Sequence, residues 1–244
     1  MKMGKLYVIG TPIGNLQDIT LRALATLDKI EVLVCEDSRV ASRLINKYIE
    51  LGYITNKPRY LAYNEFNENV VWEEVVALVA AGKSVGLVSD AGMPAISDPG
   101  YRAIRGCLDQ GLEVEIIPGV SALTTALTWS GIGGEVTLYQ GFLPKGSGKA
   151  KEYLEAGREL GTRLRSARLV LYVSPHRIAR DLTLAGEVLG GEARVVVLRE
   201  MTKAFEERVE GSVRELLEKY QTHKPKGEIV VVIAVNGRSS KTVV

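Results

Sequence analysis

The sequence has few of the residues that commonly build metal sites, disulfides or covalent catalytic sets. Its 244 residues include only two cysteines, Cys35 and Cys107, and two histidines, His176 and His223. Their spacing matches no zinc-ligand pattern, and no Ser–His–Asp or Cys–His arrangement is evident. We therefore expect no metal site and no covalent intermediate. Two isolated cysteines are typical of buried thiols in a reducing compartment, which favours the cytoplasm.

Long apolar runs are also missing. No stretch of about 18 apolar residues occurs, so no transmembrane helix is expected. The first residues, MKMGKLYVIGTPIGN, contain no apolar core of a signal peptide. We expect a cytoplasmic protein with no membrane partner. Apolar residues still make up 46% of the chain, which is enough to build a substantial core.

Two signatures of nucleotide-phosphate sites are absent as well. The segment GTPIG at 10–14 resembles half of a dinucleotide fingerprint but lacks the full G-x-G-x-x-G pattern, and no P-loop motif occurs. Pro12 also removes a backbone donor where a phosphate would need one. Gly10 and Gly14 either form a tight turn or allow a ligand to approach the backbone.

The net charge is small, but it is unevenly distributed. The formal charge is +2. Residues 1–118 carry a net charge of −3 and residues 119–244 a net charge of +5. The window 145–180 holds nine basic and three acidic residues. This window favours either a polyanion partner or an ordinary solvated helix face.

Short apolar strands alternate with amphipathic helices, which predicts an α/β protein. In the first half we expect strands at 5–10, 31–36, 59–62, 84–89 and 113–117, and helices at 19–28, 39–51, 68–81, 99–110 and 120–130. In the second half we expect strands at 136–141, 168–173, 194–198, 206–210 and 228–234, and helices at 149–162, 176–189 and 212–220. Four of these helices are followed by a glycine, namely Gly52, Gly82, Gly111 and Gly131. Helices commonly end at a residue with a left-handed backbone conformation, which glycine adopts readily. We expect a mostly parallel sheet in domain 1–118 and a mixed sheet in domain 119–244.

Polar, Gly-rich and Pro-rich segments follow most of the strands, and ligands of open α/β sheets bind at such strand ends. In SDAGMPAISDPG (89–100), Asp98 is expected to cap the next helix with Pro99 at its first position. The residues before Asp98 form a loop longer than the turn needs. Such a loop offers backbone groups to a neutral, adenosine-like ligand.

Three other strand ends carry charged groups. Asp37 and Arg39 in EDSR form either a solvated pair with a helix cap, or a general base with an arginine that orients the substrate. Arg177 in SPHR lies at a helix start, where it either contacts an anion or belongs to a capping turn with solvated side chains. Glu200 and Lys203 in REMTK form either a structural ion pair or part of a site.

Eight segments occur in the order seen in one enzyme family. They are GTPIGNLQDITLRAL, CEDSR, SDAGMPAISDPGY, IPGVSA, GFLP, SPHR, RE-T-K-FEE and KGE. Together they extend over about residues 5–235. In these segments the chain resembles the 16S rRNA ribose 2′-O-methyltransferases of the tetrapyrrole methylase superfamily.

The resemblance implies a fold, a methyl donor and an acceptor. The implied fold is that of the class III methyltransferases, two α/β domains with the donor in the cleft between them. The implied donor is S-adenosyl-L-methionine, and the acceptor is a cytidine ribose of 16S rRNA in the small ribosomal subunit. A homodimer is also implied.

The resemblance further implies roles for individual residues. The donor-binding residues would be Pro12, Ile13, Ala91, Gly92, Met93, Pro94, Ile96, Ser121, Ala122, Tyr172, Met201 and Glu228. Candidate bases for the ribose hydroxyl are Asp37, Glu65 and Glu200, and the groups that would hold phosphate or ribose are Arg39, Arg177 and Lys203.

The chain departs from the family pattern at two places. Met93 stands where relatives usually have threonine, and Asn64 and Phe66 stand in a loop that is commonly rich in histidine. Two other functions stay open. One is a methylase of the same superfamily that acts on a tetrapyrrole or another small molecule, and the other is a binding module without catalysis.

Overall fold

The computed structural model describes residues 4–164 and 166–235. These residues form two compact units, which divide between Ser121 and Ala122. The first unit contains β1 (Lys5–Ile9), η1 (Leu16–Asp18), α1 (Leu21–Leu27), β2 (Val32–Cys35), α2 (Ser38–Glu50), β3 (Arg59–Ala62), α3 (Glu68–Ala80), β4 (Ser84–Leu87), α4 (Tyr101–Asp109) and β5 (Glu113–Ile117). The second contains α5 (Ala122–Ser130), β6 (Val136–Phe142), α6 (Ser147–Leu164), β7 (Ala167–Val173), α7 (Ile178–Leu189), β8 (Arg194–Arg199), β9 (Glu207–Ser212), α8 (Val213–Thr222) and β10 (Ile229–Val235).

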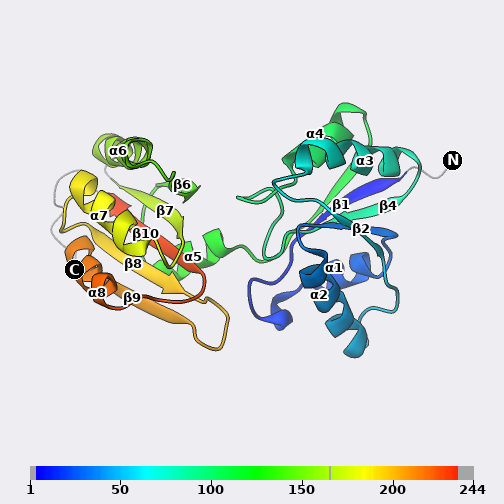
Figure 1. Cartoon of the computed structure of the whole chain (residues 1–244), viewed down its shortest axis with the longest axis horizontal. Helices are drawn as coiled ribbons and strands as arrows, with labels where there is room; N and C mark the ends of the chain where they lie inside the picture. Colours follow the sequence, from blue (N-terminus) through cyan, green and yellow to red (C-terminus); the bar gives the residue numbers. More distant parts are fainter. Residues whose placement is uncertain (1–3, 165, 236–244) are drawn as a thin grey trace. The chain divides into compact units, whose positions relative to one another are not determined.

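The first sheet is entirely parallel, in the order β3-β2-β4-β1-β5. Because successive side chains of a strand point to opposite faces, each strand contributes to two cores. Leu6, Val8 and Leu87 pack with residues of α3 and α4. Ile9 and Leu33 pack with residues of α1 and α2 on the other face. Figure 1 shows these two helix layers on either side of the strands.

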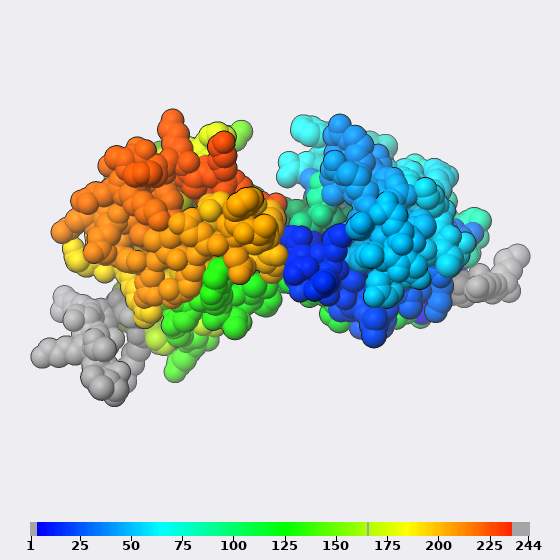
Figure 2. All heavy atoms as spheres, turned by 90° about the horizontal axis from the view of Figure 1, so that it is seen from below, coloured from blue at the N-terminus to red at the C-terminus, as the bar shows by residue number. Residues whose placement is uncertain are grey.

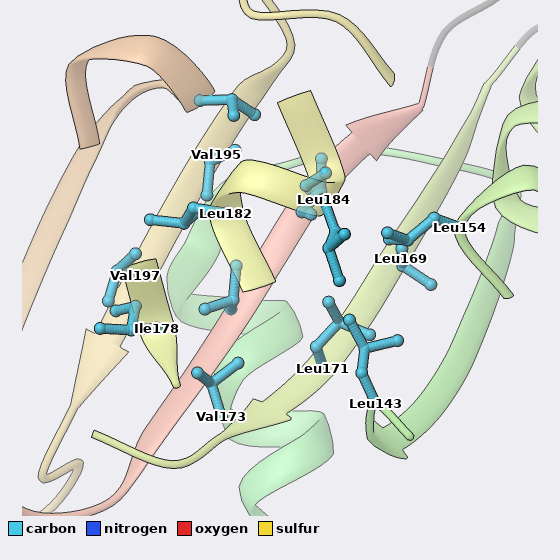
Figure 3. Close-up of a cluster of buried hydrophobic side chains, with 14 of the residues drawn as sticks. Leu143, Leu154, Leu169, Leu171, Val173, Ile178, Leu182, Leu184, Val195 and Val197 are labelled. Atoms are coloured by element: carbon cyan, nitrogen blue, oxygen red, sulfur yellow. The ribbon is translucent and has the colours of Figure 1, made fainter. Parts of the chain in front are cut away.

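The second sheet is mixed, in the order β6-β7-β10-β8-β9. Strands β6 and β7 are parallel, and β10 runs antiparallel to both β7 and β8. The carboxyl ends of β6, β7 and β8 therefore lie at one edge of the sheet. Alternate residues, among them Leu169, Leu171 and Val197, face α6, α7 and α8 in the cluster of Figure 3. Helix α5 packs against β10 and β8.

The fold class predicted from the sequence is confirmed. Each predicted strand and helix is present, with ends that differ by no more than two residues. The four glycines predicted to end helices have positive φ angles, between 66° and 85°. A short 3-10 helix, η1, was not predicted.

The predicted cap of one helix is wrong. Helix α4 begins at Tyr101 rather than at Pro99, and Gly100 occupies the N-cap position with no side-chain cap. The φ angle of Gly100 is 146°, a conformation that favours glycine. Asp98 and Pro99 therefore belong to the loop after β4, which ends two residues later than predicted.

Candidate functional site

The loops after β1, β4 and β5 meet at the carboxyl edge of the first sheet. Thr11 and Gly92 exchange two backbone hydrogen bonds, of 2.9 and 3.1 Å. The buried Thr11 hydroxyl lies 3.4 Å from the carbonyl oxygens of both Ser89 and Gly92. Gly10 and Gly119 pack so closely that a Cβ on Gly10 would lie 2.8 Å from the Gly119 Cα. The three loops therefore form one hydrogen-bonded and closely packed unit.

Backbone strain among the described residues is confined to two loops. The non-glycine residues with positive φ are Ala95 and Ser97 in the loop after β4, and Glu200 and Thr202 in the loop after β8. Such conformations cost about 1–3 kcal/mol each and cluster where ligands bind. Both loops contain residues that the family resemblance assigns to the donor, namely 91–96 and Met201. The strain is an independent observation that favours a ligand at each loop.

The predicted donor-binding residues of the first unit lie in these meeting loops or directly after them, and Ala122 follows as the first residue of α5. Pro12, Ile13, Gly92 and Pro94 are buried. Ala91, Met93, Ser121 and Ala122 are half-buried, and Ile96 is exposed. A Cβ added to Gly10 would lie 2.6 Å from the Met93 sulfur, so the methionine packs on the β1 loop.

The predicted donor-binding residues of the second unit belong to the carboxyl edge of its sheet. Tyr172, near the end of β7, packs edge-on against Tyr139 and Phe142 with ring-centroid distances of 5.3 and 5.9 Å. Met201 is buried in the loop after β8. Glu228 directly precedes β10, and its exposed carboxylate binds Lys203.

Asp37 is committed to two local interactions. Its carboxylate accepts the backbone N–H of Arg39 at 2.8 Å, which caps α2, and it forms a forked ion pair with the Arg39 guanidinium. The Arg39 hydrogen bonds hold the pKa of Asp37 at about 2. A carboxylate of such low proton affinity is a weak base at neutral pH. The side chain of Arg39 is otherwise exposed.

Glu36 is a candidate site residue that the sequence did not single out. Burial raises the pKa of its carboxyl to about 7, helped by the charges of Asp90, Asp98, Glu65 and Asp37. These groups come from the ends of β2, β3 and β4. A hydrogen bond of 3.2 Å from the Asp37 N–H to the Asp90 carboxylate joins two of the segments. In the sequence, only the adjacent carboxylates of Glu36 and Asp37 indicate such a cluster. The sheet topology brings Asp90, Asp98 and Glu65 close to them.

The raised pKa of Glu36 has a consequence for stability. The carboxyl binds its proton more tightly in the folded chain, with a pKa near 7, than at its ordinary value of 4.5. Its contribution to stability is therefore complete below pH 4.5 and is lost as the pH rises through 7. We expect Glu36→Gln to be more stable than the wild type at pH 8 by about 1–2 kcal/mol, after discounting for partial exposure, and to show little difference at pH 4.5.

Urea unfolding at pH 4.5, 6, 7 and 8 measures this difference. Glu218→Gln is the matched control, because Glu218 is an exposed helical glutamate with no ion pair among the described residues. A Glu36→Gln difference that stays constant across this pH range would contradict the assignment.

The loop after β8 is held by a network around Glu200. Its carboxylate accepts hydrogen bonds from Lys203 Nζ at 2.8 Å and from the Glu228 N–H at 2.9 Å. Lys203 also binds the Glu228 carboxylate at 3.0 Å. The bond from Lys203 lowers the pKa of Glu200. Two sequence-predicted residues, Glu200 and Lys203, are thus brought together, and both also shape the loop.

Arg177 holds a loop of its own unit. Its guanidinium donates to the carbonyl oxygens of Leu143 and Pro144 at 2.6 and 3.1 Å. Arg180 joins it, and the buried Asp181 carboxylate lies 3.6 Å from Arg177 and 2.8 Å from Arg180. The cluster fixes the segment between β6 and α6, so a substrate role for Arg177 would compete with these bonds.

The basic window 145–180 is partly neutralised within the unit. Five of its eight described basic residues bind protein groups, namely Lys151, Arg158, Arg168, Arg177 and Arg180. Lys145, Lys149 and Arg163 form no ion pair within residues 4–164 and 166–235. The cations available to a polyanion are therefore fewer than the sequence count indicates.

Both thiols are buried, as predicted, and burial raises the pKa of Cys35 to about 12 and of Cys107 to about 11. Such thiols are unreactive at neutral pH. The described part of the chain contains no cluster of three His, Cys, Asp or Glu side chains arranged to hold a metal ion. It also contains no helix with the length and apolar character needed to cross a membrane.

Comparisons with known proteins identify the family. A family model described as Tetrapyrrole (Corrin/Porphyrin) Methylases matches residues 5–217. A protein of Thermotoga maritima named Ribosomal RNA small subunit methyltransferase I is 40% identical over 95% of this chain and 99% of its own. One of the same name from Mesorhizobium japonicum is 43% identical over 93% of this chain and 74% of its own.

A solved structure shows the same fold. It is the uroporphyrin-III C-methyltransferase of Thermus thermophilus in complex with S-adenyl homocysteine. It covers 94% of this chain and 97% of its own, with a TM-score of 0.62 and 18% identity. The family model covers most of the chain, the relatives extend along nearly all of it, and the first sheet is parallel and the second mixed, as predicted. The chain belongs to the tetrapyrrole (corrin/porphyrin) methylase family.

Proposed function

We propose that the protein is an S-adenosylmethionine-dependent methyltransferase that modifies the RNA of the small ribosomal subunit, at the ribose 2′-oxygen of a cytidine. The observation that carries the proposal is the 40% identity over nearly the full length to a protein named for that RNA. The motifs that resemble the 16S rRNA ribose 2′-O-methyltransferases support the choice of oxygen and nucleotide.

The residues at the carboxyl edge of the first sheet fit the donor. The loops after β1 and β4 present backbone rather than fixed cations. Four carboxylates act on Glu36 there, and such a concentration of negative charge attracts the positively charged sulfonium. S-adenosylmethionine, when bound, supplies the methyl group for in-line transfer. The chain contributes mainly alignment of the reacting groups.

We propose Glu36 as the group that accepts the ribose hydroxyl proton. Its pKa of about 7 matches proton transfer near neutral pH. Asp37 and Glu200, both candidates from the sequence, have pKa values lowered by their ion pairs. Glu65 remains the alternative base. Arg39 and Lys203 are proposed to hold phosphate or ribose, Arg39 because its side chain is largely exposed.

A methyl-transfer assay tests the function. The acceptors are small ribosomal subunits and naked rRNA, both from cells that lack this modification, with radiolabelled donor. Nuclease mapping and mass spectrometry then locate the methyl group. We expect one ribose 2′-O-methyl group in the subunit. Glu36→Gln is expected to lower kcat by about 10²–10⁴-fold while donor affinity is retained.

Other outcomes identify the rival functions. Methyl transfer to a precorrin-type acceptor, and to neither RNA, would place the protein among the small-molecule methylases of the family. Donor binding without transfer to any acceptor would favour a binding module without catalysis. Full activity in Glu36→Gln, Asp37→Ala, Glu65→Ala and Glu200→Ala alike would remove every base named here.

We propose that the protein acts in the cytoplasm and as a homodimer. Two free, buried thiols suit a reducing compartment. Light scattering of the purified chain measures the oligomeric state, and a monomer at micromolar concentration would contradict the second part of the proposal.

A further inference from the structure

All three phenylalanines of the chain are exposed. Phe66, Phe142 and Phe205 keep 95%, 53% and 77% of their surface accessible to solvent. Phenylalanine is among the residues most often fully buried, and both units of this chain have large cores. Those cores consist mainly of Val, Leu and Ile, with a few tyrosines. All three aromatic rings are therefore available to a partner at the surface.

Each phenylalanine lies where a strand reaches its carboxyl end. Phe66 follows β3 in the first unit, Phe142 is the last residue of β6, and Phe205 lies in the loop after β8. In each unit this is the edge that carries the candidate donor loop. The space-filling view of Figure 2 shows the segment after β8, at the orange part of the scale, on the surface of the second unit.

Phe66 is presented by a loop that hydrogen bonds hold in place. The Asn64 side chain accepts the N–H of Phe66 at 3.1 Å. Asn67 accepts the N–H of Asn64 at 2.8 Å and donates to the Ala62 carbonyl oxygen at 3.0 Å. The ring therefore projects into solvent from an ordered turn. Its chain neighbour is Glu65, one of the carboxylates that act on Glu36.

Phe142 is turned toward Tyr172 by a β-bulge. The pairing of β6 with β7 shifts register between Tyr139 and Gly141, and Gly141 has a φ angle of 66°. Residues three apart in a regular strand point to opposite faces. The extra residue of the bulge brings Tyr139 and Phe142 against the same ring of Tyr172. Bulges that redirect a side chain are frequent next to active sites.

Phe205 is held in a similar way. Its loop contains a hydrogen bond from the Thr202 N–H to the Glu206 carboxylate, at 2.9 Å, and one from the Glu206 N–H to the Lys203 carbonyl oxygen, at 3.2 Å. The residue lies two positions after Lys203, a proposed substrate contact. All three rings are thus presented to solvent by ordered backbone beside proposed site residues.

We propose that Phe66, Phe142 and Phe205 bind unstacked nucleobases of the RNA substrate by stacking, an inference that rests on the proposed function. Proteins recognise single-stranded RNA by stacking its bases on aromatic rings. Loops and bulges of a ribosomal RNA carry unstacked bases that such rings can bind. Lys145 and Lys149, which follow Phe142 and form no ion pair with described residues, provide cations for the phosphates.

The test compares Phe→Leu and Phe→Trp substitutions at each of the three positions. Leucine keeps apolar surface but removes the ring, and tryptophan keeps a ring that stacks. Tyr53→Leu is the control. Tyr53 is 56% exposed, but it follows α2 at the opposite edge of the first sheet. Affinity for labelled small subunits and for single-stranded RNA is measured by filter binding, which does not depend on turnover.

We expect each Phe→Leu variant to bind subunits about 5–100-fold more weakly and each Phe→Trp variant to bind like the wild type. The affinity of Tyr53→Leu for subunits should not change, and neither should the affinity of the Phe66 and Phe205 variants for S-adenosylhomocysteine. Wild-type affinity in all three leucine variants would overturn the inference. So would weaker RNA binding that accompanies dissociation of a dimer in light scattering, because the rings would then join two copies. Failure of methyl transfer with intact ring-dependent binding would instead contradict the proposed function.

Discussion

Replacing Gly10 by valine is expected to weaken binding of S-adenosylhomocysteine about 100-fold or more, and replacing it by alanine about tenfold. A Cβ at this position would lie 2.8 Å from the Cα and N atoms of Gly119, and 2.6 Å from the Met93 sulfur. The methionine side chain is flexible and can change its rotamer, but the backbone of Gly119 is fixed by its close packing on Gly10. Overpacking of this kind costs about 1–3 kcal/mol. It separates the loops that we propose to hold the donor.

Calorimetry with S-adenosylhomocysteine measures the effect, and circular dichroism checks that each variant is folded. Gly148→Ala is the control, since a Cβ at Gly148 has no atom within 4 Å. Gly119→Ala should behave like Gly10→Ala, because the Gly119 Cβ would approach the Gly10 backbone at 3.0 Å. A folded Gly10→Val variant with wild-type affinity would place the donor away from these loops.

The elements of the fold were predictable because the local signals agree with the packing. In β7 the alternation of Leu169, Leu171 and Val173 marks one core face. The helix-ending glycines, such as Gly52 with a φ of 78°, mark where helices stop. Asp98 is a misleading signal, because a good capping residue followed by proline is typical of a helix start. The chain instead uses Gly100, whose positive φ carries the loop into α4.

The chemistry of the site was less predictable, because it depends on residues that only the topology brings together. Glu36 acquires its pKa of about 7 from burial and from carboxylates at three strand ends. Asp37, beside it in the sequence, has a pKa of about 2 because Arg39 binds it. The sequence EDSR alone does not show that these two neighbouring carboxyl groups have such different pKa values. Likewise, the number of basic residues near Arg177 does not indicate that its guanidinium donates hydrogen bonds to two backbone carbonyl oxygens.

Removing the buried carboxylate of Asp181 is expected to have the largest effect on stability. Its side chain is 4% exposed, and it lies 2.8 Å from Arg180 and 3.6 Å from Arg177. Asp181→Ala leaves two guanidinium groups, each about a quarter exposed, without their counter-charge. Breaking a buried pair in this way costs about 3–5 kcal/mol. We expect about 3 kcal/mol, because both arginines keep their carbonyl acceptors in the segment between β6 and α6.

Urea unfolding of the second unit measures this loss, followed by a probe in that unit such as a fluorophore on α7. Glu155→Ala removes the partner of Arg158 on the exposed face of α6 and is expected to cost less than about 1 kcal/mol. Asp181→Asn should fall between the two, since the amide oxygen still accepts a hydrogen bond from Arg180. If Asp181→Ala lowers the free energy of unfolding no more than Glu155→Ala does, the two arginines are stabilised by the carbonyl oxygens of residues 143–145 alone. The carboxylate would then be retained for a purpose other than stability.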